Sequence, residues 1–295
     1  MKSGEGGIAV GRVVVGATPI GNDADASDHL RELLAEADVV AAEDTRRARA
    51  LAKRLGIAPK GRMVSLYDAN EQVRARELVD AALEGATVLL VSDAGTPLVS
   101  DPGFRVVRLA AAEGVRVACA PGPSAVLAAL AVSGLATDRF VFEGFWPRKA
   151  AKAADLAAQL ATERRTAVFF VAARRLPAAL TQMVEAWGSD RPAVVCRELT
   201  KVHEEIWRGS IGELAVRAAQ GEVLGEVTLV VAGAPPADPG LAALAARVNA
   251  RVAKGERLAG VVAEVAAQTG APRRALYEAA LLREGPGEER PGEEG

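Results

Sequence analysis

The run Val-Leu-Leu-Val-Ser-Asp-Ala-Gly-Thr-Pro-Leu-Val-Ser-Asp-Pro-Gly, residues 88–103, decides how this chain folds. It begins with an apolar segment, Val88–Val91, and continues at once into a segment with two Ser-Asp pairs and two prolines. A strand cannot extend its ladder through these prolines, because proline has no backbone N–H and fixes φ. We therefore expect a buried strand that ends in a rigid loop, in which Asp93 and Asp101 can accept hydrogen bonds from a ligand.

Short apolar runs like this one recur on both sides of it, with longer amphipathic runs between them. Such runs, separated by helices, are typical of a parallel sheet that is covered on both faces. Residues 8–122 are therefore predicted to form an α/β domain, which would bind ligands at the carboxyl ends of its strands. The expected strands are Val13–Val15, Val39–Ala42, Met63–Leu66, Val88–Val91 and Val115–Ala118, and the expected helices are Asp28–Ala35, Arg46–Leu55, Gln72–Leu83 and Phe104–Glu113.

The pattern changes after Pro121-Gly122-Pro123. A helix over Ser124–Val132 precedes closely spaced strand candidates, so we expect a second α/β domain with a mixed sheet at 123–235 and a cleft between the domains. The candidates are Arg139–Phe142, Ala167–Val171, Ala193–Arg197, Glu204–Arg208 and Glu226–Val231, with a helix over Ile211–Ala219.

A proline-rich linker, residues 234–240, follows the second domain. Three short helices are expected beyond it, over Leu241–Val252, Arg257–Thr269 and Arg273–Arg283. Their tight last turn is typical of a helix-turn-helix unit, which we place at 241–284. The tail, 285–295, is rich in Gly, Pro and Glu and is expected to be disordered.

Composition excludes several classes of protein. The chain has 295 residues, of which half are hydrophobic and a quarter charged, and a formal net charge of −2. This is the mix of an ordinary globular protein of about two domains, not of a uniformly basic nucleic-acid binder. Local excesses of positive charge nevertheless occur at 43–76, with nine basic and four acidic residues, and at 241–284, with seven and four. Contacts to an RNA backbone require such local excesses.

Metal, disulfide and membrane chemistry are not expected. Cys119 and Cys196 lie in apolar stretches and should be buried, reduced thiols. His29 and His203 are isolated and form no zinc-ligand pattern. Residues 1–7 lack the apolar core of a signal peptide, and the most apolar window, 115–136, is interrupted by Pro and Gly. We therefore expect a cytoplasmic protein.

Three further loops follow strands in this arrangement. Residues 16–22 contain neither Gly-x-Gly-x-x-Gly nor Gly-Lys-Ser/Thr, which favours a ligand without a phosphate chain. Residues 43–47, Glu-Asp-Thr-Arg-Arg, have two interpretations: a helix capped by Asp44 or Thr45, or a site that handles a hydroxyl and a polyanion together. Residues 121–125 bring Ser124 to a helix start as a plausible cap.

Eight strings in chain order, between about Arg12 and Leu281, resemble the ribosomal RNA small subunit methyltransferase I family, a branch of the tetrapyrrole methylase superfamily. They are Ala-Thr-Pro-Ile-Gly-Asn (17–22), Ala-Glu-Asp-Thr-Arg (42–46), Val-Ser-Asp-Ala-Gly-Thr-Pro (91–97), Asp-Pro-Gly (101–103), Pro-Gly-Pro-Ser-Ala (121–125), Asp-Arg-Phe (138–140), Glu-Gly-Phe (143–145) and Arg-Glu-Leu-Thr-Lys (197–201). The resemblance implies a two-domain α/β fold, S-adenosylmethionine as methyl donor in the interdomain cleft, a homodimer, and 2′-O-methylation of a cytidine in the decoding region of 16S ribosomal RNA.

The resemblance also implies roles for individual residues. The donor site would be lined by Pro19, Ile20, Asp93, Ala94, Gly95, Thr96, Pro97, Ser124, Ala125, Phe170, Val171, Ala172 and Thr228. The RNA side and the catalytic groups would include Glu43, Asp44, Glu198, Lys201, Arg46, Arg47, Asn70, Glu71, Arg273 and Arg274. The general base stays open among Asp44, Glu43 and Glu198, while Lys201 and Arg46 could hold adjacent phosphates.

One string departs from the family pattern. Val171 and Arg174 stand where the family usually has an acid and a histidine, so the roles of those two positions are not carried over. Three other functions fit this sequence less well than an RNA methyltransferase. A tetrapyrrole methyltransferase would not explain Arg-Glu-Leu-Thr-Lys or the basic C-terminal helices. A nucleotide-dependent oxidoreductase should show a Gly-rich fingerprint. An RNA-binding module without activity would leave the constrained strand-end loops unexplained.

Overall fold

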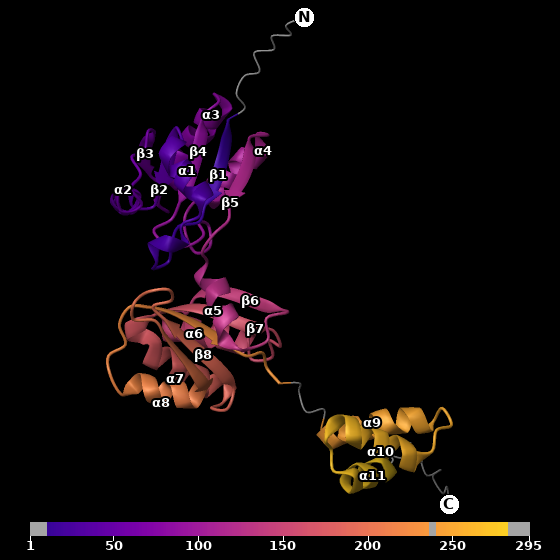
Figure 1. Ribbon diagram of the computed structural model, residues 1–295. Coiled ribbons are helices and arrows are strands. Elements are labelled where there is room, and N and C mark those ends of the chain that lie inside the picture. Colours follow the sequence, from indigo (N-terminus) through magenta and orange to yellow (C-terminus); the bar gives the residue numbers. More distant parts are fainter. Residues whose placement is uncertain (1–10, 236–239, 283–295) are drawn as a thin grey trace, which may run out of the picture. The chain divides into compact units, whose positions relative to one another are not determined.

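The computed structural model describes residues 11–235 and 240–282. The chain divides into two compact units, residues 1–234 and 235–295, which are described separately below (Figure 1). The expectations for residues 1–7, for most of the proline-rich linker and for the tail at 285–295 lie outside the described residues.

The first sheet of the larger unit has five strands in the order β3-β2-β4-β1-β5, and all its pairs are parallel. The predicted parallel sheet is therefore confirmed, with strand ends that differ by one or two residues. Its strands are β1 (Arg12–Gly16), β2 (Val39–Ala42), β3 (Arg62–Ser65), β4 (Thr87–Val91) and β5 (Arg116–Ala120).

Helices cover both faces of this sheet because successive strand residues point to opposite sides. Leu90 and Val13 pack with α3 (Glu71–Leu83) and α4 (Phe104–Ala112), whereas Leu89 and Val14 pack on the other face with α1 (Asp28–Glu36). The helix α2 (Thr45–Arg54) contributes Ala48 to that second face. Every strand therefore delivers its C-terminal loop to one edge of a rigid, doubly covered sheet.

The second sheet is mixed, as predicted, with the order β6-β7-β10-β8-β9. Only β6 and β7 pair in parallel, and the other pairs are antiparallel. Its strands are β6 (Phe140–Phe145), β7 (Thr166–Ala172), β8 (Pro192–Arg197), β9 (Glu205–Ser210) and β10 (Glu226–Val231). One face packs on α5 (Ala125–Ser133), whose Ala129 is fully buried beside Val168 and Val230.

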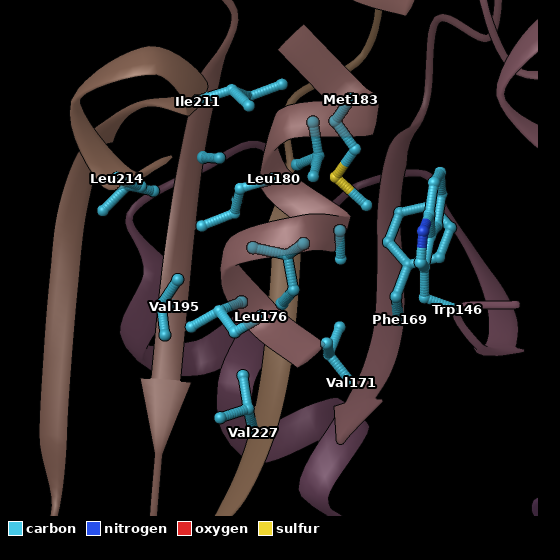
Figure 2. Packing of buried hydrophobic residues seen from close by; sticks show 14 of the residues in the cluster. Trp146, Phe169, Val171, Leu176, Leu180, Met183, Val195, Ile211, Leu214 and Val227 are labelled. Carbon is cyan, nitrogen blue, oxygen red and sulfur yellow. The ribbon is translucent and has the colours of Figure 1, made fainter. Parts of the chain in front are cut away.

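The other face of this sheet carries two helices that the sequence analysis missed, α6 (Ala150–Gln159) and α7 (Leu176–Trp187), beside the predicted α8 (Ile211–Ala219). Figure 2 shows Leu176, Leu180 and Met183 of α7 directed into this core. The helix α6 buries the small side chains of Ala153 and Ala157, and its partly buried Leu156 packs against the same core. A short 3-10 turn, Asp23–Asp25, and another, Ala173–Arg175, complete the unit.

The smaller unit consists of α9 (Gly240–Val252), α10 (Leu258–Thr269) and α11 (Arg273–Leu281), as predicted to within two residues. Val248, Val262 and Leu276, one from each helix, are completely buried in its core. Gly270 ends α10 with φ of +72°, and Pro272 precedes α11, which makes the tight last turn.

Two local expectations are wrong. Cys196 is buried, but Cys119 is exposed, because β5 is an edge strand of the first sheet. Ser124 occupies the N-cap position of α5, yet its side chain makes no capping hydrogen bond. Among the described residues, no helix combines the length and the apolar character needed to cross a membrane.

Candidate active site at the strand ends

The loops after the first-sheet strands are tied to one another by hydrogen bonds. Thr18 and Gly95 form an antiparallel bridge, with N–H to O distances of 2.9 and 3.0 Å in the two directions. The Thr96 hydroxyl donates to the carbonyl of Pro123 at 3.0 Å. These bonds join the first, third and fourth loops, which lie far apart in the sequence, into one wall.

This wall faces the second sheet across a cavity of about 400 Å³, which we call the donor cleft. Loops of the first sheet supply one side, and the ends of β7, β8 and β10 supply the other. The volume lies within the roughly 300–1,000 Å³ that is usual for small-molecule sites. The lining residues are Ile20, Glu43, Arg47, Asp93, Ala94, Gly95, Thr96, Val99, Ser100, Asp101, Ser124, Ala125, Phe145, Phe170, Val171, Ala172, Cys196, Leu199, Gly225, Glu226, Val227 and Thr228.

Most of the predicted donor-site residues lie on this cleft: Ile20, Asp93, Ala94, Gly95, Thr96, Ser124, Ala125, Phe170, Val171, Ala172 and Thr228. Pro97 does not line it, and Pro19 lines a neighbouring cavity instead. Phe145, Cys196, Leu199 and Glu226 also line the cleft, although the sequence did not predict them. Cys196 is opposite Thr228 in the β8–β10 register, a neighbour relation that no single strand reveals.

Carboxylates dominate the charge of the cleft. Glu43, Asp93, Asp101 and Glu226 line it together with a single cation, Arg47. Burial raises the pKa of Asp101 to about 6, and the nearby Glu43 carboxylate adds to this effect. Burial also raises the pKa of Glu43, with a further contribution from Asp93. Asp101 can therefore exchange its proton near pH 6, and the pKa of Glu43 is shifted in the same direction.

Asp44 does not line the cleft. Its carboxylate caps α2 by accepting from the Arg46 backbone N–H at 2.8 Å, and it also binds the Arg46 guanidinium at 2.7 and 3.1 Å. These bonds to Arg46 hold the pKa of Asp44 well below its ordinary value. The capped-helix interpretation therefore describes Asp44, whereas its neighbour Glu43 is directed into the cleft.

The side chains of Glu198 and Lys201 form an ion pair within their own loop. Lys201 Nζ lies 2.8 Å from Glu198 Oε1 and 3.0 Å from Glu226 Oε2. Burial opposes the charge of Glu198, but the Lys201 ammonium and the Glu226 N–H outweigh it, so the pKa of Glu198 is lowered. Neither Glu198 nor Lys201 lines the cleft, and their neighbour Leu199 does.

Gly21 of the first loop packs directly against this second loop. A Cβ on Gly21 would lie 2.8 Å from Thr200 Oγ1 and 2.9 Å from the Leu199 carbonyl oxygen, so only glycine permits the approach. Thr200 Oγ1 is buried there without a hydrogen-bond partner among the described residues. The contact holds Ile20 and Leu199, which both line the cleft, at fixed positions.

The four described non-glycine residues with positive φ all belong to loops that border the cleft. Leu98 and Ser100 have φ of 72° and 68°, and Glu198 and Thr200 have φ of 52° and 64°. Left-handed conformations cost of order 1–3 kcal/mol and persist where surrounding structure imposes them. The residues with strained backbone therefore lie in the same two loops that border the cleft.

The predicted substrate residues fall into different environments. Arg47 lines the cleft and pairs with Asp93 at 3.1 Å, while Arg46 is exposed and paired with Asp44. Asn70 holds its own turn by accepting from the Tyr67 N–H and donating to the Ser65 carbonyl. Arg273 and Arg274 belong to the smaller unit, where Arg274 pairs with Glu278 at 2.9 Å.

Glu71 corrects one expectation. Its carboxylate is buried and accepts from the backbone N–H groups of Gly103 and Arg105 at 2.9 and 2.8 Å, at the start of α4. Because the Glu71 carboxylate is buried and hydrogen-bonded to the backbone, it exposes little surface that an RNA could contact. It holds the end of the 92–103 loop instead, which gives it a structural role beside the cleft.

The basic segment 43–76 is less positive in space than in sequence. Asp23 pairs with Arg54, Glu77 pairs with Arg62 and Arg74, and Glu113 pairs with Arg76. In the part of the chain that the structure describes, Arg49 and Lys53 have no ion-pair partner. Also within the described ranges, no group of three or more His, Cys, Asp or Glu side chains could hold a metal ion.

The departure from the family pattern lies at the end of β7. Val171 lines the cleft, whereas Arg174 pairs with Glu222 at 3.3 Å on the surface. Arg175 donates to the Arg148 carbonyl at 2.6 Å. At these two positions the chain therefore offers an apolar wall and a surface ion pair, not an acid and a histidine.

Comparison with known proteins decides the family. Residues 13–215 match the family model described as Tetrapyrrole (Corrin/Porphyrin) Methylases. The chain is 55% identical to a ribosomal RNA small subunit methyltransferase I from Mycobacterium tuberculosis (strain CDC 1551 / Oshkosh), over 92% of this chain and 95% of that protein. It is 38% identical to the protein of that name from Escherichia coli O157:H7, over 93% and 96%. This chain belongs to the ribosomal RNA small subunit methyltransferase I family.

Solved structures agree with this fold. A uroporphyrin-III-C-methyltransferase from Thermus thermophilus superposes with a TM-score of 0.53 at 20% identity, over 75% of this chain and 94% of that one. A diphthine synthase superposes with a TM-score of 0.55 at 18% identity, over 75% and 89%. As a member of the methyltransferase I family, the chain is a methyltransferase that uses S-adenosylmethionine.

The cleft suits this donor chemically. S-Adenosylmethionine carries a sulfonium and an ammonium but no phosphate, and the lining has four carboxylates, one guanidinium and no phosphate-binding fingerprint. Phe145 and Phe170, whose ring centroids lie 5.4 Å apart, add aromatic surface, which attracts a cation. The residues present therefore fit the donor.

Proposed function

We propose that this chain methylates the 2′-hydroxyl of a cytidine ribose in the decoding region of 16S ribosomal RNA. The observation that carries the proposal is the pairing of a donor-sized cleft with Glu43, a carboxylate on its wall whose pKa is raised. The relatives align with more than nine-tenths of this chain, and their names support ribosomal RNA as the substrate.

Binding and orientation are the main work of the residues in the cleft. S-Adenosylmethionine, when bound, supplies a methyl group on a positively charged sulfur that leaves as a neutral thioether. The lining residues from Ile20, the 93–96 segment, Ala125, Phe170 and Thr228 would hold the donor. Holding the reacting groups in line can supply on the order of 7–11 kcal/mol of the barrier.

Glu43 is proposed as the general base. The ribose 2′-hydroxyl must lose its proton as its oxygen forms the new bond to carbon, and Glu43 accepts that proton. Asp44 is a weaker candidate because Arg46 occupies it and lowers its pKa. Glu198 is occupied by Lys201. Asp101, whose pKa is about 6, lies on the same cleft and can share the proton.

The RNA backbone is proposed to run over cations that lack an acidic partner. In the larger unit these include Arg49 and Lys53 on α2, and in the smaller unit they include Arg257 and Arg273, judged over the described residues. We propose residues 8–122, 123–235 and 241–284 as the domains, with the last as an RNA-binding unit. A cytoplasmic homodimer that acts on the small ribosomal subunit or its RNA completes the proposal.

The test uses small ribosomal subunits that lack the modification. The full chain is incubated with S-adenosylmethionine labelled in its methyl group, and the RNA is digested to nucleosides. Label should appear on the 2′-oxygen of one cytidine. Absence of label from RNA, or label on a base, contradicts the proposal.

A tetrapyrrole methyltransferase of the same superfamily is the second candidate, because the solved structures that resemble this fold include enzymes named for such substrates. Their sequence identity of about 20% shows the fold alone. Incubating the chain with labelled donor and a uroporphyrin tests this candidate directly, and transfer to the macrocycle would favour it.

A further inference from the structure

A second cavity of about 240 Å³ adjoins the donor cleft, and we call it the α2 cavity. The two cavities share Arg47 and Asp93 as wall residues. One face of α2 forms its far wall with Ala50, Leu51 and Arg54, which follow Arg47 at helical spacing.

The chemistry of the wall favours a neutral ligand. Arg47 is paired with Asp93 at 3.1 Å, and Arg54 is paired with Asp23 at 2.7 and 3.1 Å. A phosphate would therefore meet a carboxylate and two cations that are already neutralised. A ring with both donors and acceptors can bond to an ion pair without separating it, because a carboxylate accepts at several positions and a guanidinium donates from five N–H groups.

The size of the cavity also fits one ring. Its volume is below the roughly 300–1,000 Å³ of sites for drug-sized ligands. Pro19, Leu34 and Leu51, which are largely buried, give the cavity an apolar wall beside the polar pair, as a base-reading pocket requires. A nucleotide whose ribose reaches the donor cleft must place its base in an adjoining space.

We propose that the α2 cavity binds the cytosine base of the nucleotide to be methylated, with Arg47 and Asp93 reading its Watson–Crick edge. This inference rests on the proposed function. Two guanidinium donors and one carboxylate acceptor complement the acceptor, acceptor and donor of cytosine at O2, N3 and N4. Uracil has acceptors at O2 and O4 and a donor at N3. Its N3–H would therefore face a guanidinium donor of Arg47, and its O4 would face the Asp93 carboxylate, which is also an acceptor. The pair is thus a specificity determinant.

A cavity-filling variant tests the site. Ala50 is exposed, lines the α2 cavity and does not line the donor cleft, so Ala50→Leu fills one space and spares the other. The matched control is Ala154→Leu, at an exposed alanine within α6 that lines neither cavity. We expect Ala50→Leu to lower kcat/KM for RNA at least tenfold, with donor Kd within twofold of wild type and Tm unchanged. Ala154→Leu should behave as wild type.

A substrate change separates the base from other occupants. The same RNA is prepared with cytosine, with uracil, or with no base at the target ribose. Wild type should methylate the abasic RNA at least about 100-fold and the uridine RNA at least about tenfold more slowly. Ala50→Leu should have no further effect on the abasic RNA, because the group that it displaces is already missing.

Several outcomes overturn the inference. Ala50→Leu could slow the cytidine and abasic substrates by the same factor, which would place another part of the RNA in the cavity. It could also leave both rates unchanged. Failure of the proposed function shows separately, as a wild-type protein that puts no label on ribose. In that case equilibrium binding of the same RNAs is measured, and Ala50→Leu must still weaken the cytidine RNA alone.

Discussion

Two loops of the larger unit, residues 92–103 and 198–201, resemble each other in backbone and differ in electrostatics. Each holds two non-glycine residues with positive φ, two positions apart. In the first loop, Asp101 lies in the cleft with no cationic partner among the described residues, and its pKa is about 6. In the second loop, Lys201 binds Glu198 at 2.8 Å, and the pKa of Glu198 is lowered.

The difference shows how one strained backbone serves two purposes. Where a carboxylate is buried without a cation, it keeps a proton that can be exchanged near neutral pH. Where a lysine neutralises it, the carboxylate becomes a structural contact that closes the loop. We therefore propose proton transfer on the side of Glu43 and Asp101, and positioning on the side of Glu198 and Lys201.

The largest expected effect is on the rate of methyl transfer. Glu43→Gln removes the proposed base and should lower the single-turnover rate about 10²–10⁴-fold, because general base catalysis contributes that much. Asp44→Asn is the matched control, since asparagine still caps α2, and it should cost less than about tenfold. Quench-flow with saturating donor and RNA measures both. A larger loss in Asp44→Asn than in Glu43→Gln would contradict the assignment.

The next effect concerns stability and its dependence on pH. The pKa of Asp101 is about 6 in the folded state, against an ordinary 3.8, so the folded chain binds this proton more tightly than the unfolded chain. The stability that this proton provides is complete below pH 3.8 and is lost as the pH rises through 6. Asp101→Asn should therefore stabilise the chain by up to about 3 kcal/mol at pH 8.

Urea unfolding between pH 4.5 and 8 checks this sign. The difference between Asp101→Asn and wild type should grow as the pH rises to about 6 and then stay constant. A difference that shrinks with rising pH would mean that the Asp101 carboxylate has a cationic partner in solution.

The second loop should respond in stability more than in rate. Lys201→Met leaves the largely buried Glu198 carboxylate without its partner, which should cost about 1–3 kcal/mol of unfolding free energy. The single-turnover rate with saturating donor and RNA should fall less than tenfold, and Lys201→Arg should restore most of the stability. A rate loss as large as that of Glu43→Gln, without a loss of stability, would return Lys201 to the catalytic groups.

The smallest effect is expected at Thr200. Its φ of 64° is strained for a β-branched residue, and its buried hydroxyl has no partner among the described residues. Thr200→Gly removes both penalties at the cost of greater freedom in the unfolded chain, so we expect a gain of about 0.5–1 kcal/mol. Thermal unfolding of Thr200→Gly and Thr200→Ala separates the two penalties, because only glycine relieves the backbone. A loss of stability in Thr200→Gly would show that packing of the Thr200 methyl group contributes more free energy than the backbone strain costs.

The sequence predicted the first sheet well because its signals are local. Each strand is a short apolar run with a helix after it, and β4 ends at Val91, where the apolar run gives way to the loop that contains the prolines at 97 and 102. The elements of the second sheet were predicted less completely. In α6, alanines fill both buried and exposed positions, so they do not mark the buried face, and α7 lies in the sequence between two apolar strands, β7 and β8.

The sequence by itself determined the family, the α/β class and the loops that form the site, because these depend on residue types at short spacing. Only the tertiary structure decided which carboxylates are paired with a cation or with backbone N–H groups and which line the cleft. Asp44 and Glu43 are neighbours in sequence, yet Arg46 binds one and the cleft receives the other. Glu71 is committed to backbone N–H groups more than thirty residues away. Burial and charge pairing depend on which distant segments meet, and the spacing of residues along one chain does not specify that.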